Sequence, residues 1–436
     1  MFKIFVNAWR VQDVRKKLLF IFLLLLIYRL GSSIPLPGID LEMLYMVRHG
    51  GLWDAPTTIF NMIMGGGLGS LFAMGIAPYI TASIIMQLLT YAIPKLSEMQ
   101  KEGEDGRKKI GQITRYMSVG LAALQSAAMV FSWTRLPLAD GFSANLFRPE
   151  HQNFFVYMLA TVAMITGTIF IMWLAEILTE KGIGNGASFL IFANILAALP
   201  NGAMNLWMLA SGGEGIRGPV LAVLLLAVFA LVIAFVVWVH EGERRIPVQY
   251  SRKAASGRAA YGNNTSYFPL KVNIAGVMSI IFAISLLHFP MQIQQFFPNA
   301  QGWGTVVRFL AIEHWVGATL YVVLIFVFTH FYTSFAVNPQ EIAENLKKNG
   351  GFIPGIRPGT PTKEYFQTTV TRLSWIGAVF YSLIALMPVL IGRFIPEFPV
   401  GFGGTTLLIV TGVALEFIKQ LESQLLMRHY KGFLSE

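Results

Sequence analysis

Residues able to carry chemistry are few and scattered in this sequence. The chain has no cysteine, which removes thiol chemistry, disulfides and Cys-ligated zinc. It also lacks the zinc-protease, serine-hydrolase and phosphate-loop motifs, and the Gly-rich stretch 65–69 is not followed by Lys-Ser/Thr. His314 and His330 share one apolar segment but lie near its opposite ends, which argues against a common metal ion. The sequence predicts no catalytic, cofactor or metal site.

Acidic residues inside membrane spans usually mark ion-coupled transport. The apolar segments here contain little beyond Glu176 and Glu416, both near segment ends. A secondary transporter with inverted repeats stays as the alternative to a passive conduit, and an intramembrane enzyme is the third hypothesis. The scarcity of embedded carboxylates argues against the transporter, and the missing motifs argue against the enzyme.

The elements that must position any functional residue are membrane-spanning helices. The 436 residues are 55% hydrophobic and 13% charged, with a mean hydropathy of +0.58. About 20 apolar residues cross a bilayer, and runs of that length recur along the chain. The sequence therefore predicts an all-α polytopic membrane protein. We expect ten spans, at 18–34, 70–93, 113–133, 153–175, 183–201, 216–239, 268–289, 313–336, 369–391 and 402–421.

Basic residues indicate how the chain crosses the membrane. Most of the 33 lysines and arginines lie in alternate connecting segments, together with both termini. By the positive-inside rule both termini are cytoplasmic. The Gly/Pro-rich segment 200–219 leaves five spans on each side, so the halves 1–205 and 206–436 would be inverted in topology. Inverted halves commonly place a pathway at their interface.

The stretch 55–94 contains an interrupted helix. A short apolar segment, 57–64, precedes a run of glycines, and a full-length apolar helix over 70–93 follows, with Pro78 inside it. Non-helical backbone survives at membrane depth only where protein buries it or where it borders a water-filled cavity. A re-entrant element inside a pore fits this pattern. A surface-lying apolar helix before an ordinary span fits it as well.

Two long cytoplasmic segments, 240–267 and 337–368, are basic and contain interspersed Tyr, Phe, Gly and Pro. Loops of this length usually carry function. Arginine and lysine next to aromatic residues suit contacts with RNA or with an acidic protein. The alternative is that these charges set topology and contact anionic lipid headgroups.

Several motifs resemble the SecY/Sec61 family of protein-conducting channels. GIAPYITASIIMQLL at 75–89 resembles the family's second-span signature, and WLAEILTEKGIGNGASFLIF at 173–192 resembles its second signature. The segments 34–40, 101–110, 269–277 and 351–362 also resemble bacterial members, so the resemblance covers essentially the whole chain. It implies two five-span halves around an hourglass pore in the bacterial plasma (inner) membrane. A plug would close the pore outside, and a lateral gate would open it to lipid.

The resemblance also implies site residues. The pore ring would consist of Ile76, Ile80, Ala187, Ile191, Met278, Leu408 and Ile409. Ala187 and Met278 stand where the family more often has isoleucine, so the ring would be looser or differently sealed. The plug, 57–68, would include Thr57, Ile59, Phe60, Asn61, Met62, Ile63, Met64, Gly65, Gly66, Gly67 and Leu68. Gln87 and Asn273 would supply a polar cluster at the lateral gate.

The partners follow from the same resemblance. Signal sequences and unfolded preproteins would pass through the pore, membrane lipids would surround it, and the small subunits SecE and SecG would complete the complex. The two basic segments would dock the ribosome or the SecA motor ATPase, with Arg357 most tied to motor coupling. The docking residues would be Arg244, Arg245, Arg252, Lys253, Arg258, Lys347, Lys348 and Arg357.

Overall fold

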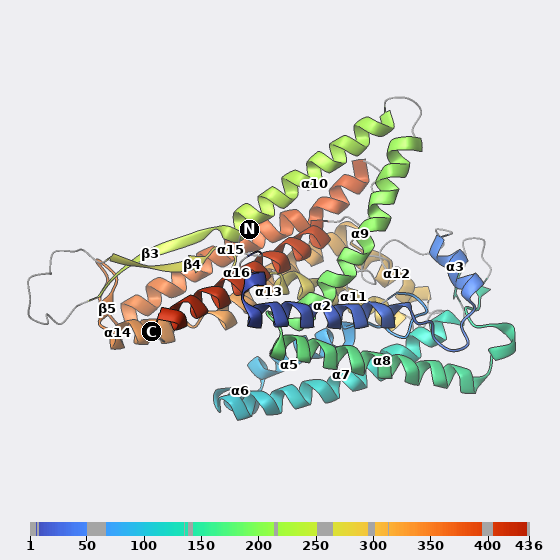
Figure 1. The fold of residues 1–436 in the computed structure, drawn as a ribbon, viewed down its shortest axis with the longest axis horizontal. Helices are drawn as coiled ribbons and strands as arrows, with labels where there is room; N and C mark the ends of the chain where they lie inside the picture. Colours follow the sequence, from blue (N-terminus) through green and yellow to red (C-terminus); the bar gives the residue numbers. More distant parts are fainter. Residues whose placement is uncertain are drawn as a thin grey trace, which may run out of the picture.

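The computed structural model describes residues 6, 8–49, 67–134, 136–137, 143–212, 217–250, 265–294, 301–312, 314–394 and 404–433. Within these ranges the fold is a bundle of long helices (Figure 1). A small sheet and the C-terminal end of α16 lie at one end of the bundle, and the short helix α3 lies at the other (Figure 1).

The elements before residue 213 are mostly helices. They are α2 (Gln12–Ser33), α3 (Leu41–His49), α5 (Ala77–Ala92), α6 (Pro94–Lys101), α7 (Glu104–Trp133), β1 (Leu136–Pro137), β2 (Ser143–Ala144), the 3-10 helix η1 (Pro149–His151), α8 (Phe154–Lys181) and α9 (Gly186–Gly212).

The elements after residue 216 add a sheet to the bundle. They are α10 (Arg217–Glu241), β3 (Glu243–Tyr250), β4 (Thr265–Lys271), α11 (Met278–Gln294), α12 (Gln301–Leu310), α13 (Trp315–Ala336), α14 (Pro339–Lys348), β5 (Gly351–Phe352), α15 (Thr360–Phe394) and α16 (Gly404–Phe433).

Each of the ten expected spans overlaps one of these helices. In the part of the chain that the structure describes, five stretches are long and apolar enough to cross a membrane: Phe154–Lys181, Gly186–Met208, Gly218–Glu241, Trp315–Lys348 and Thr360–Met387. The bent pair α5 and α6, at 100° to each other, would be a sixth. The fold class is as predicted, and the count of ten stays a prediction.

Two predicted spans begin later than expected. Residues 71–76 form turns, and α5 begins only at Ala77, with Pro78 in its first turn. Proline has no N–H to donate, so it suits the start of a helix and not its middle. The span expected at 268–289 also starts late, since its first residues belong to β4 and α11 begins at Met278. The backbone N–H and C=O groups of β4 bond to β3 instead of forming helical hydrogen bonds.

The boundary expected between the halves falls inside a helix. α9 continues through Pro200 and ends at Gly212, so residue 205 is helical. Of the segment expected to connect the halves, 200–219, residues 200–212 therefore belong to α9. Residues 217–219 belong to α10, which starts at Arg217.

The two basic segments share one sheet. β3 pairs antiparallel with β4 through seven residues, from Glu243↔Lys271 to Gln249↔Thr265, and with β5 at Gln249↔Phe352. The strand order is β4-β3-β5. Ile246 and Val248 of β3 are buried against Phe366 of α15, which gives this region its own hydrophobic core. The segments 240–267 and 337–368 thus form one structural unit across the described strands.

Candidate functional site

Four helices bring the predicted ring residues into one hydrophobic cluster. Ile80 lies on α5 and Ile191 on α9, and both are buried. Leu408 and Ile409 of α16 are fully buried at 0% exposure. Ile76, the N-cap of α5, is also buried, while Ala187 and Met278 are partly buried and pack against the same cluster. All seven residues thus belong to a single cluster, although they are spread along most of the chain.

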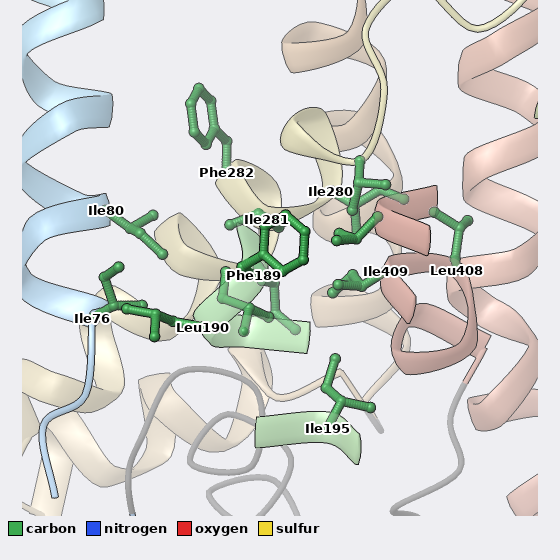
Figure 2. Packing of buried hydrophobic residues seen from close by; sticks show 14 of the residues in the cluster. Ile76, Ile80, Phe189, Leu190, Ile195, Ile280, Ile281, Phe282, Leu408 and Ile409 are labelled. Carbon is green, nitrogen blue, oxygen red and sulfur yellow. The ribbon is translucent and has the colours of Figure 1, made fainter. Parts of the chain in front are cut away.

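Figure 2 shows the arrangement of the cluster. Ile76 and Ile80 of α5 lie at one side, and Leu408 and Ile409 of α16 lie at the other. Residues between them include some that the sequence analysis did not single out: Phe189, Leu190 and Ile281 (Figure 2). A helix that is apolar on all faces has no periodic contrast to mark its inner side, so periodicity had no signal for them.

The cluster is built from aliphatic and aromatic side chains, which offer a polar ligand little to bind. A hydrophobic constriction excludes water and ions by dewetting. The arrangement suits a barrier that adapts its shape rather than one that recognises a ligand.

The predicted plug lies largely outside the described residues, since Thr57 to Gly66 are not among them. Gly67 and Leu68 are described, and Leu68 packs against the second hydrophobic cluster. The segment that follows is tied to the end of α2. The Leu36 amide donates to the Gly69 carbonyl at 2.9 Å, and the Leu71 amide donates to the Ile34 carbonyl at 2.9 Å. These bonds hold residues 69–71 beside the residues that follow α2.

The two predicted gate amides have separate partners. α5 packs against α11, but Gln87 of α5 donates to Ser83 of the same helix, at 3.5 Å. Asn273, just before α11, contacts His240 at 2.9 Å and accepts hydrogen bonds from the Gly276 amide and the Tyr381 hydroxyl. The structure therefore gives Asn273 partners within residues 240–381 and not on α5.

A cavity of about 960 Å³ opens beside α5. Its walls come from α5, α6, α13 and α15, and they include Gln87, Tyr91, His330 and Trp375. His330 Nδ1 lies 3.2 Å from Ser374 Oγ. Most of the lining is apolar, so the cavity suits a hydrophobic segment or an acyl chain.

The predicted docking residues that the structure describes are exposed. Arg244 and Arg245 lie on β3, Lys347 and Lys348 end α14, and Arg357 lies in the turn before α15. The Arg357 carbonyl accepts a hydrogen bond from Thr362 Oγ1 at 2.9 Å, which holds the turn. Arg252, Lys253 and Arg258 fall outside the described residues. Strand β3, which carries Arg244 and Arg245, and helix α14, which carries Lys347 and Lys348, lie at the same end of the bundle (Figure 1).

The other residues considered for chemistry do not form a metal site. His314 caps α13, and its Nδ1 accepts from the Val316 amide. Glu416 is exposed and accepts from Gln420 of the same helix at 3.4 Å. Within the ranges that the structure describes, no three His, Cys, Asp or Glu side chains gather closely enough to hold a metal ion.

A bundle of long apolar helices packed around one shared hydrophobic cluster defines the class of polytopic helical membrane proteins. The SecY family model matches residues 70–418 of the chain. The protein translocase subunit SecY of Streptomyces galbus is 42% identical over 442 residues, covering 100% of both chains. That of Halalkalibacterium halodurans is 41% identical, again over 100% of both.

Solved structures agree on the fold. One described as a protein conducting channel has a TM-score of 0.62 at 17% identity, covering 92% of this chain and 90% of the other. Sec61 in the canine ribosome-channel complex has a TM-score of 0.59 at 17% identity, with the same coverage. This chain belongs to the SecY family. The family predicted from the motifs is confirmed, and with it the prediction that the chain is a channel and not an enzyme.

Proposed function

We propose that the chain passes unfolded polypeptides through its central apolar cluster, and releases hydrophobic segments into lipid between α5 and α11. The channel role rests on the family, whose relatives are protein translocase subunits. The position of the pore is supported by one observation: the seven predicted ring residues, from α5, α9, α11 and α16, lie in one cluster. The ring would be Ile76, Ile80, Ala187, Ile191, Met278, Leu408 and Ile409.

The proposed resting state is sealed by this ring and by segment 57–68 as the plug. A dewetted collar of side chains needs no fixed geometry, so it can widen around chains of any sequence. The cavity beside α5 would receive a hydrophobic segment that is leaving the pore. The halves 1–205 and 206–436 would move apart on either side of the ring. Both termini would be cytoplasmic.

The proposed partners dock at the β4-β3-β5 sheet and the turn around Arg357. Two of the solved structures with this fold are ribosome complexes: Sec61 in the canine ribosome-channel complex and the idle yeast Ssh1 complex bound to the 80S ribosome. The exposed Arg244, Arg245, Lys347 and Lys348 suit ribosomal RNA or a motor ATPase such as SecA. SecE and SecG would complete the complex.

The test is the resting ion conductance of the reconstituted complex in planar bilayers. Ile80→Asn and Ile191→Asn should each raise this conductance, because a polar side chain wets the constriction. Leu124→Asn is the control, since Leu124 of α7 is 60% exposed and lies outside the cluster. Conductance that stays at the unmodified level in both ring variants would remove these residues from the seal.

A further inference from the structure

The start of α11 is held by a buried set of hydrogen bonds, which we call the Asn273 cluster: His240, Asn273, Gly276 and Tyr381. Asn273 is 5% exposed and Tyr381 is 0% exposed. Asn273 Oδ1 accepts from the Gly276 amide at 2.9 Å and from the Tyr381 hydroxyl. Asn273 Nδ2 lies 2.9 Å from His240 Nε2 and donates to it when the histidine carries its proton on Nδ1.

These bonds tie together three parts of the chain. His240 lies in the last turn of α10, Asn273 and Gly276 belong to the turn between β4 and α11, and Tyr381 lies in the middle of α15. Gly276 has φ +62°, a left-handed conformation that favours glycine. The direction in which α11 leaves the sheet is therefore set by one asparagine side chain that bridges two other helices.

A fourth helix closes this site. Gly412 of α16 lies so near the turn that a Cβ there would be 2.3 Å from Val277 Cγ2 and 3.2 Å from His240 Nε2. The start of α11 is thus enclosed by α10, α15 and α16, while the body of α11 packs against α5. A shift at the turn would move the face of α11 that meets α5.

We propose that His240, Asn273 and Tyr381 are positioning residues that hold α11 against α5, and so set how hydrophobic a segment must be to open the gate. The inference rests on the proposed role of α5 and α11 as the lateral gate. Loosening the turn weakens the contact between the two helices, because α11 then samples orientations that no longer match α5. A segment of lower hydrophobicity then suffices to separate them.

The experiment compares two preproteins, one with a strongly and one with a weakly hydrophobic signal segment, in proteoliposomes that hold the whole translocase. The readout is the ratio of weak to strong substrate transported, which a general loss of activity does not change. Tyr381→Phe removes one hydroxyl and should raise the ratio about fivefold, the value of one buried hydrogen bond. Asn273→Leu removes all three bonds and should raise it further.

The matched control is Ser382→Ala. Ser382 is next to Tyr381 on α15 and is 6% exposed, and its hydroxyl has no hydrogen-bond partner within the described residues. Its ratio should match that of the unmodified protein. An unchanged ratio in both Tyr381→Phe and Asn273→Leu, or an equal rise in the control, would overturn the proposal.

A second readout does not depend on transport. Because the chain has no cysteine, a pair of cysteines placed on the facing sides of α5 and α11 reports their contact through its rate of disulfide formation. Tyr381→Phe should slow this rate, and an unchanged rate would count against the proposal. Failure of the gate itself is distinguishable: the pair would then still cross-link, but the disulfide between α5 and α11 would leave the transport of both preproteins unchanged.

Discussion

Arg115 donates from Nε to Glu176 Oε1 at 2.6 Å and so joins α7 to α8. Glu176 is one of the two acids that an ion-coupled carrier would have needed. Its pairing with an arginine near the end of both spans gives it a structural role. This agrees with membership of a channel family and removes one of the few arguments for a secondary transporter.

The ion pair should contribute little to stability. The side chains are 52% and 27% exposed, and partly exposed pairs are worth about 1 kcal/mol or less. We expect Arg115→Gln, Glu176→Gln and the double variant to give a coupling free energy below about 1 kcal/mol in a double-mutant cycle. Unfolding of the purified complex in detergent measures it, and a coupling of several kcal/mol would contradict the solvated pair seen here.

A second prediction concerns the contact between α8 and the segment 67–76. A Cβ on Gly167 would lie 2.3 Å from the Leu71 carbonyl oxygen, which is backbone, and 3.1 Å from the Phe72 ring. Phe72 is itself stacked between Tyr28 and Phe170, at 5.9 and 5.8 Å. Gly167→Ala should therefore destabilise the complex by about 1–3 kcal/mol, the usual cost of overpacking.

The control for this substitution is Gly120→Ala. Gly120 lies in the middle of α7, and a Cβ there would meet nothing within 4 Å. Alanine is the better helix former by up to about 1 kcal/mol, so this variant should unfold at the same or a higher temperature. Equal unfolding temperatures for the two variants would show that α8 can move away from Leu71 without cost.

A third prediction concerns the exposed turn before α15. Arg357→Glu should lower motor-driven translocation by at least about tenfold, because reversing a charge at the proposed docking surface would add repulsion to the lost attraction. Lys363→Glu makes the same change in net charge a few residues away, where Lys363 bonds Gln340 at 3.2 Å. It should have a much smaller effect.

Assembly of the complex should be the same in both of these variants, since the Arg357 carbonyl and not its side chain holds the turn through Thr362. Transport in vesicles and co-purification of the motor provide the two measurements. An equal loss in Arg357→Glu and Lys363→Glu would assign the effect to total charge instead of to position 357.

The sequence alone determined the class, the family and the approximate places of the helices. Whether a segment of about 20 residues partitions into a bilayer depends on its own composition. A membrane span can therefore be predicted without knowing which helices pack against it. The predicted starts of α5 and α11 were wrong because the true starts depend on other parts of the chain. Residues 69 and 71, just before α5, are hydrogen-bonded to residues 36 and 34, and β4, just before α11, pairs with β3.

Only the tertiary structure decided which side chains meet. The sequence suggested that Asn273 would join Gln87, but its partners His240 and Tyr381 are 33 and 108 residues away. It likewise treated 240–267 and 337–368 as two loops, whereas β3 joins β4 and β5 in one sheet. In helices that are apolar on every face, periodicity cannot mark the inner side. The packing of one helix against another therefore selects the partners, and that selection requires all the helices at once.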